Sequence, residues 1–252
     1  MTSKFKSFFK ETIVLFRNVP SLITALFVAS VIAMNLLANK SINLPFDWLA
    51  LDCGILFSWV AFLLMDIVTR RYGVKAANTV SVCALLANLL ISLFFIAASF
   101  IPGTWSQSYV DGSEAIINTA LDATFASSWF VILGSSVAFL ASAFLNNFLH
   151  ALIEKSFKKS NFTAFSVASY VSTFVAQFVD NLVFALLVSL NFFGWTIVQC
   201  LTCALTGAVV ELIGEVLFSP LGYRVAKRLE NDNVGAEYLA LLNNAENAQI
   251  KE

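Results

Sequence analysis

The residues that could do chemistry in this chain lie inside long apolar segments. Asp180 stands in the middle of one such segment and shares one face, at helical spacing, with Thr173, Gln177 and Phe184. This stripe presents a hydroxyl, an amide, a carboxyl and an aromatic ring, with Asn181 beside it. An ionised group near the centre of a bilayer costs about 2.5–3.5 kcal/mol even on the insertion scale. A serine would hold two helices together at less cost, so we expect Asp180 and Gln177 to contact a substrate.

Further polar groups in other apolar segments could complete such a site. Glu211 lies four residues before Glu215 on one helical face. For Glu211, a substrate contact and an interhelical hydrogen bond stay open as alternatives, whereas for Glu215 the hydrogen bond is favoured. Asp52 lies one turn inside the outer boundary of another apolar segment, in which the flat ring of Trp59 could stack on a heterocycle. We add the amide of Asn35 to these candidate contacts.

The remaining reactive side chains predict no catalysis and no cofactor. His150 is the single histidine, and we expect it near the inner membrane boundary with its polar tip directed to the surface. Asp66 is expected at the interface, beside Arg70. Cys200 and Cys203 form a C-x-x-C pair that lacks a second pair of metal ligands, so they are interpreted as packing residues. No nucleophile with a matching base and no phosphate-binding loop is recognisable, so we expect no enzyme and no metal.

The composition shows what kind of fold must hold these groups. The chain has 252 residues, of which 59% are hydrophobic and 12% charged, and its mean hydropathy is +0.81. Soluble domains carry about 25% charged residues. A soluble enzyme, a nucleic-acid binder and a disordered chain are therefore disfavoured. The apolar runs are long enough to cross a hydrocarbon core of about 30 Å, which takes roughly 17–25 residues. We expect an all-α polytopic membrane protein, with residues 1–252 forming a single integral membrane domain.

Six transmembrane helices are predicted, because backbone polar groups in lipid must be bonded within the segment. Their expected bounds are Ser21–Ala38, Trp48–Val68, Ala76–Ile101, Ser128–Ile153, Ala164–Asn191 and Trp195–Leu221. Residues 1–20 are interpreted as a retained amphipathic lead-in. Residues 102–127 are predicted to form an extracytoplasmic loop with a short helix on the membrane, and residues 224–252 a cytoplasmic tail.

The charges predict the orientation of this six-helix bundle. Every Lys and Arg except Lys40 falls at one end of the predicted helices, and Asp47, Asp111, Glu114 and Asp122 collect at the other. Cations favour the cytoplasmic side, so both termini are expected in the cytoplasm of a multi-pass protein of the cell (inner) membrane. Four tryptophans mark the opposite boundary as an aromatic belt: Trp48, Trp105, Trp129 and Trp195.

Four motifs in order resemble those of the VUT (vitamin-uptake-like) family, also called the queuosine precursor transporter family. Residues 35–40 are similar to its N-x-x-A-x-K, and residues 52–54 with 66–73 to its D-x-G and D-x-x-x-E-x-Y-G. Residues 172–180 are similar to S-T-x-x-S-Q-x-x-D, and residues 219–223 to T-P-x-x-Y. The likeness extends over roughly residues 25–228. It implies a six-helix inner-membrane protein that takes up 7-deazaguanine precursors of queuosine.

The departures from the family pattern cluster at charged positions. Arg70 stands where the family has Glu, and Glu211 where it has a basic residue. Ala168 replaces an Arg, and Ala176 a Ser. One hypothesis is that Arg70 and Glu211 meet as a pair in which acid and base are exchanged.

Together these features predict an importer of a small planar, purine-like or deazapurine-like metabolite, with no nucleic-acid partner. Its site is expected between the second, fifth and sixth predicted helices, where Asp180 or Glu211 could carry a coupling proton. The alternative is a substrate-binding subunit of an energy-coupling-factor vitamin transporter, docked through the small-residue ridge of Ala25, Ala29 and Ala33. In the lipid bilayer, the protein is expected to associate either with a second copy of itself as a homodimer or with such an energy-coupling-factor partner.

Overall fold

The computed structural model describes residues 3–42, 44–49, 51–105, 114–126, 129–159 and 161–249, and these form an all-α protein. Within them the only β-type pairing is an isolated antiparallel bridge between Ser41 and Asp52. The elements are α1 (Ser3–Asn18), α2 (Ser21–Leu37), α3 (Ile55–Tyr72), α4 (Val74–Ser99), α5 (Glu114–Ala126), α6 (Trp129–Ser156), α7 (Phe162–Phe184), a π-helical turn (Ala185–Ser189), α8 (Leu190–Phe192), α9 (Ile197–Asn231) and α10 (Ala236–Gln249).

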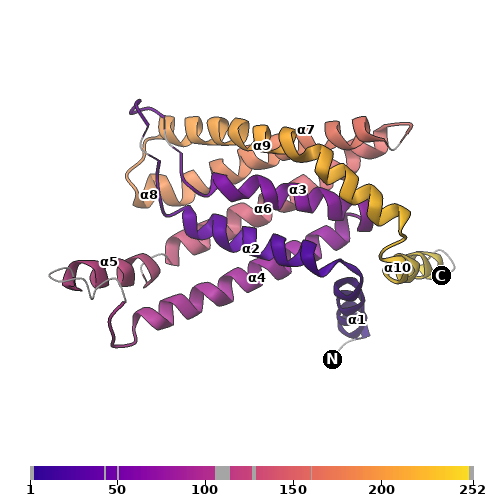
Figure 1. Ribbon diagram of the computed structural model, residues 1–252, viewed down its shortest axis with the longest axis horizontal. Helices are drawn as coiled ribbons and strands as arrows, with labels where there is room; N and C mark the ends of the chain where they lie inside the picture. Colours follow the sequence, from indigo (N-terminus) through magenta and orange to yellow (C-terminus); the bar gives the residue numbers. More distant parts are fainter. Residues whose placement is uncertain are drawn as a thin grey trace.

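The long helices run between two ends of the bundle (Figure 1). One end holds α1, α10 and both ends of the chain, and the other holds α5 and α8 (Figure 1). Arg70 and Arg71 close α3 at the first of these ends, and Lys155 lies in the last turn of α6. We call it the basic end, and the opposite end the loop end. α7 packs between α6 and α9, while α3 contacts both α2 and α9.

Several helices are long and apolar enough to cross a membrane. They are Val74–Ser99, Ala115–Ser156, Phe162–Phe192 and Ile197–Asn231, and a bent pair, Phe8–Asn18 with Ser21–Leu37, adds a fifth candidate if it counts as one span. α2 has 17 residues, or about 26 Å at 1.5 Å per residue. α3 has 18 residues and carries Asp66, Arg70 and Arg71. The chain is thus a multi-pass helical membrane protein, and the count of six crossings stays a prediction.

The predicted helix Trp48–Val68 was wrong at its start, because α3 begins only at Ile55. The carboxylate of Asp52 accepts a hydrogen bond of 2.7 Å from the backbone N–H of Gly54. Such a local bond offers the backbone an alternative to the helix. The backbone of Cys53 also donates to the carbonyl of Lys40 (2.8 Å), so the residues before α3 fold back on those after α2.

Pro220 does not end the last long helix, which was predicted to stop at Leu221 and runs on to Asn231. Proline has no N–H for the carbonyl four residues earlier, here that of Val216. The hydroxyl of Ser219 donates to this same carbonyl (3.2 Å). The predicted tail therefore contains the end of α9 and all of α10.

The predicted loop 102–127 contains a short helix, α5, as expected. The ring of Phe125 stacks on Phe95 of α4 with centroids 4.9 Å apart, and the indole N–H of Trp105 donates to Asp122 (2.8 Å). These contacts hold α5 against α4 at the loop end. Asp111, which was assigned to this loop, lies outside the described residues.

Candidate functional site

An acidic cavity of about 30 Å³ lies between five helices near the loop end. It is lined by Met34, Asn35, Ala38, Asp52, Gly54, Ile55, Ser58, Ser135, Asp180, Asn181, Phe184 and Glu211. This space holds about two water molecules, whereas binding sites for small molecules have volumes of roughly 300–1,000 Å³, so a ligand enters only if the surrounding helices or side chains move apart. None of these lining residues is a Lys or an Arg. The cavity therefore concentrates three carboxyl groups with no cationic side chain among its lining residues.

Each of the three acidic side chains is held by a specific donor. Asp180 of α7 accepts a hydrogen bond of 2.6 Å from the hydroxyl of Ser142 of α6. This bond involves the Oδ1 atom of Asp180 and not its Oδ2 atom. Glu211 of α9 accepts hydrogen bonds from Ser58 of α3, and from Asn181 of α7 at 3.1 Å. Asp52 is bonded to the backbone of Gly54. These bonds fix the orientation of the carboxyl groups while leaving Asp180 and Asp52 partly accessible from the cavity.

Two glycines permit this arrangement by close approach. A Cβ atom at Gly207 would lie 2.5 Å from Nδ2 of Asn181, so the missing side chain makes room for the amide that reaches Glu211. A Cβ atom at Gly54 would lie 2.8 Å from both Asp52 Oδ1 and the carbonyl oxygen of Met34. Gly54 therefore lets the start of α3 approach the end of α2, where Asn35 lies.

The structure brings together five of the candidate residues and separates three. Asp180, Asn181, Glu211, Asp52 and Asn35 all line the acidic cavity. Thr173 and Gln177 lie farther along α7 toward the basic end. Both are fully buried, and neither the Thr173 hydroxyl nor the Gln177 amide has a hydrogen-bond partner within the described part of the chain.

Trp59 does not line the cavity. Its ring stacks on Phe218 with centroids 4.6 Å apart, packs over Gly214, and donates its indole N–H to the carbonyl of Leu56 (3.0 Å).

The site also includes residues of α2 and α6, two helices outside its expected location between the second, fifth and sixth predicted helices. Ser58, Ser135 and Ser142 were missed because serine is frequent in apolar helices and carries no distinguishing pattern.

The hypothesis of an Arg70–Glu211 pair was wrong. Arg70 forms ion pairs with Glu154 of α6 (2.5 Å) and with Glu230 near the end of α9 (2.8 Å). Glu211 is bonded to Ser58 and Asn181 instead. Arg70 joins α3, α6 and α9 at the basic end because it is the last turn of α3 that faces those two acidic side chains.

The expectation that the polar tip of His150 is directed to the surface was also wrong, and Asp66, which was expected at the membrane interface beside Arg70, is buried inside the bundle. Both side chains are fully buried. Asp66 accepts a hydrogen bond from Asn146 (2.8 Å) and another from Ser169, and His150 Nδ1 lies 3.1 Å from its carboxylate. Partners on α6 and α7 compensate the loss of water that burial of these groups entails.

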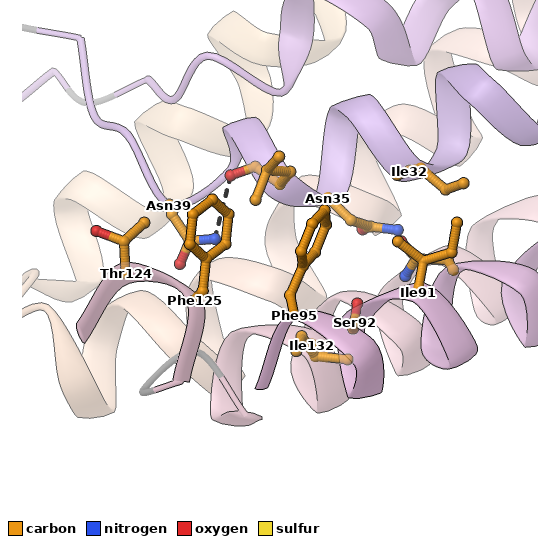
Figure 2. A pocket seen from close by; sticks show the side chains of 11 residues that line it. Ile32, Asn35, Asn39, Ile91, Ser92, Phe95, Thr124, Phe125 and Ile132 are labelled. Carbon is orange, nitrogen blue, oxygen red and sulfur yellow. Dashed lines mark hydrogen bonds between the residues drawn. The ribbon is translucent and has the colours of Figure 1, made fainter. Parts of the chain in front are cut away.

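A second, largely apolar hollow of about 30 Å³ adjoins the acidic cavity at Asn35. Figure 2 shows Asn35 of α2 facing this hollow, with Phe95 and Ile91 of α4 and Phe125 of α5 around it. The amide nitrogens of Asn35 and Asn88 are buried without a partner in the described residues. Asn35 is therefore the polar group shared by the two hollows.

Metal binding has no support among the described residues, where no three His, Cys, Asp or Glu side chains are grouped to hold an ion. Cys200 and Cys203 are buried free thiols. Cys200 donates weakly to the carbonyl of Ala185, which agrees with a packing role.

Comparison with known proteins gives one match. A family model described as "Putative vitamin uptake transporter" matches residues 52–225, which include α3 through most of α9 and most of the residues lining the acidic cavity. No curated protein and no solved structure matches the chain.

Proposed function

Because the chain belongs to the family described as putative vitamin uptake transporters, we propose that it imports a small, planar, nitrogen-rich metabolite through the acidic cavity. A transporter needs a site between its helices that a solute can enter. The acidic cavity lies between α2, α3, α6, α7 and α9, and we propose that such a site opens there when these helices move apart. The family is one of transporters, which favours a protein that does not act as an enzyme.

The observation that carries the proposal is the convergence of Asp52, Asp180 and Glu211 on one cavity without a lining Lys or Arg. Ionised carboxylates only accept hydrogen bonds. A ligand that offers N–H donors satisfies them, and an anionic ligand is repelled by them. This favours amino, imino or amidine groups over phosphate or carboxylate groups in the substrate.

The edge of a guanine-like ring presents adjacent N–H donors of this kind. We propose that Asp180 accepts from that edge, while the amide of Asn181 or Asn35 contacts a donor and an acceptor at once. Such a pairing favours 7-deazaguanines, the substrate class that the motif resemblance implies. Discrimination follows because an analogue without the N–H donors leaves buried carboxylates unpaired.

The proposed orientation places the basic end in the cytoplasm and the loop end outside, in a protein with six crossings of the cell membrane. It is supported by Arg70, Arg71 and Lys155 at the basic end, and by both termini lying at that end (Figure 1). The acidic cavity then lies closer to the outer surface, where an importer collects its substrate.

A substrate-binding subunit of an energy-coupling-factor transporter is a second arrangement for the same site. Ala25 and Ala29 of α2 are exposed and line a shallow apolar groove, to which another membrane protein could dock. The family match does not favour this arrangement. Purification from the native membrane separates the two, because only the second predicts associated ATPase subunits.

Ligand-induced stabilisation of the purified protein tests the proposed function. The melting temperature is measured in detergent with 7-deazaguanines, purines and water-soluble vitamins. A ligand at about 100 times its Kd adds about 2.7 kcal/mol to the stability of the folded state. We expect 7-deazaguanines to give the largest shift.

Asp180→Asn is the matching variant. It replaces a charged acceptor, whose hydrogen bond is worth about 1.5–3 kcal/mol, and is expected to weaken binding by roughly tenfold to a hundredfold. Asp122→Asn is the control, because Asp122 is bonded to Trp105 at α5, away from the cavity. Equal responses of the two variants, or stabilisation by anionic vitamins alone, contradict the proposal.

A further inference from the structure

A second polar cluster lies between the acidic cavity and the basic end. It consists of Asp66 of α3, Asn146 and His150 of α6, Ser169 of α7 and Glu215 of α9, all fully buried. We call it the inner cluster. The proposed binding site makes no use of these residues, and the sequence pattern predicted positions near the membrane boundary for two of them.

The hydrogen bonds of the inner cluster require at least one of its two carboxyl groups to be protonated. The hydroxyl of Ser169 contacts both Asp66 Oδ2 and Glu215 Oε1. A hydroxyl has a single proton to donate, so it can satisfy only one of the two carboxyl groups. The other must itself be protonated and donate to the serine oxygen. One proton is therefore shared across Asp66, Ser169 and Glu215.

His150 extends this cluster toward the basic end. Its Nδ1 lies 3.1 Å from Asp66 and its Nε2 lies 3.4 Å from Glu154. Within the described residues both ring nitrogens lack a hydrogen-bond partner, because neither contact has the direction of a good hydrogen bond. A ring between two carboxylates can take a proton on one nitrogen and release one from the other. Glu154 is 13% exposed, so this end reaches the surface.

The charged groups around His150 come from each helix packed against it. Asp66 and Arg70 lie on α3, Glu154 on α6 itself, and Glu215 on α9, with Glu230 bound to the same Arg70. From α7 the ring edge of Phe165 closes the site. Arg70 holds Glu154 in place, so that the carboxylate lies between the imidazole and the guanidinium.

A polar row on α7 joins the inner cluster to the acidic cavity. Ser169, Thr173, Gln177 and Asp180 follow at helical spacing on one face. The Thr173 hydroxyl and both polar atoms of the Gln177 amide are buried without partners in the described structure. On the neighbouring α9, Glu215 lies one turn from Glu211, and its Oε2 is also unpartnered. Buried polar atoms without a protein partner are commonly satisfied by internal water, and the relay proposed below depends on such water.

We propose that this row conducts protons between the acidic cavity and the basic end, and that uptake is thereby coupled to the proton gradient. The inference rests on the proposed function, because the coupled solute is the one bound beside Asp180. A proton taken up by Asp180 or Glu211 from the loop end passes to the shared site of Glu215 and Asp66 through internal water bound by Gln177 and then Thr173, each water accepting a proton on its oxygen and giving one up to the next acceptor. His150 then accepts a proton at Nδ1 and releases one from Nε2 to Glu154, which loses it to water at the basic end.

The first experiment needs no substrate, because His150 is the single histidine of the chain. The ring is labelled with ¹⁵N in the full-length, tag-free protein in lipid nanodiscs. We expect its resonances to change protonation state with pH and its N–H protons to exchange with water. A ring locked in one protonation state at every pH at which the protein stays folded overturns the inference, whatever the protein transports.

The second experiment separates coupling from binding in proteoliposomes with radiolabelled 7-deazaguanine. Exchange at equal pH on both sides needs no net proton movement, whereas accumulation driven by an acidic outside does. His150→Gln is expected to lower accumulation about a hundredfold more than exchange, the lower end of the effect of losing a proton-transfer group.

Thr173→Val is a second variant, which is also expected to lower proton-driven accumulation much more than exchange. Ser172→Ala is its control. Ser172 is the buried neighbour of Thr173, but its hydroxyl is bonded to the backbone of Ser169 within α7. Wild-type exchange together with full accumulation in both His150→Gln and Thr173→Val overturns the coupling and leaves the proposed function standing. If the wild-type protein does not exchange radiolabelled 7-deazaguanine, the proposed function is contradicted for this substrate. The ¹⁵N spectrum of His150 then still tests whether the proton relay exists.

Discussion

The hydroxyl of Ser142 on α6 donates a hydrogen bond of 2.6 Å to Oδ1 of Asp180 on α7. This bond holds the carboxylate against α6 in a defined orientation. It uses one carboxylate oxygen, and Asp180 still lines the acidic cavity. A bond of this kind positions a binding group without occupying it.

Ser142→Ala is therefore expected to weaken 7-deazaguanine binding less than Asp180→Asn does. Loss of one bond to a charged acceptor costs about 1.5–3 kcal/mol, part of which water entering the cavity restores. Titration calorimetry on the purified protein measures the change in Kd. Ser136→Ala is the control, since its hydroxyl donates to the carbonyl of Ile132 within α6. If Ser142→Ala binds 7-deazaguanine more weakly than Asp180→Asn does, this prediction is wrong.

Gly207→Ala is expected to impair binding through Asn181. The added Cβ lies 2.5 Å from Nδ2 of Asn181 and displaces the amide from Glu211. Gly214→Ala on the same helix is the matched comparison, because its Cβ meets the ring of Trp59 outside the cavity. Overpacking costs about 1–3 kcal/mol of stability in either case. The ligand-induced shift in melting temperature should fall only for Gly207→Ala, and a fall in both variants is the opposing result.

Trp59→Phe is expected to leave uptake unchanged. The indole ring lies on Phe218 and Gly214, and its N–H is bonded to the carbonyl of Leu56 within its own helix. Phenylalanine retains the stacking and loses only that local bond. Initial uptake rates in proteoliposomes test this expectation. A loss of uptake at normal protein stability restores the stacking role that the sequence suggested for Trp59.

Arg70 is expected to couple energetically to Glu154 and not to Glu211. In a double-mutant cycle of unfolding free energy, Arg70→Met with Glu154→Gln should show an interaction of about 0.5–3 kcal/mol. Arg70→Met with Glu211→Gln should be additive within about 0.3–0.5 kcal/mol, because the two side chains share no partner. The reverse result supports the exchanged pair that the charge pattern suggested.

The sequence alone determined the environment of the protein and the composition of its central stripe. Long apolar runs with few charges can exist only as helices in lipid, which explains why the all-α membrane fold was predictable. Helical spacing placed Thr173, Gln177 and Asp180 on one face of α7, because that spacing is a local property of the backbone. The start of α3 was misplaced, since hydropathy does not register the bond between Asp52 and the backbone of Gly54.

Only the tertiary structure decided which polar groups meet. Asp66 was expected at the membrane surface because Arg70 follows it closely in sequence, yet its partners are Asn146, Ser169 and His150 on other helices. Glu211 and Asp180 were predictable as buried acids, but their donors, Ser58 and Ser142, come from α3 and α6. A polar group in a membrane helix must be satisfied by whatever the neighbouring helix presents at the same depth. That pairing depends on helix rotation and register, which no single segment of the sequence specifies.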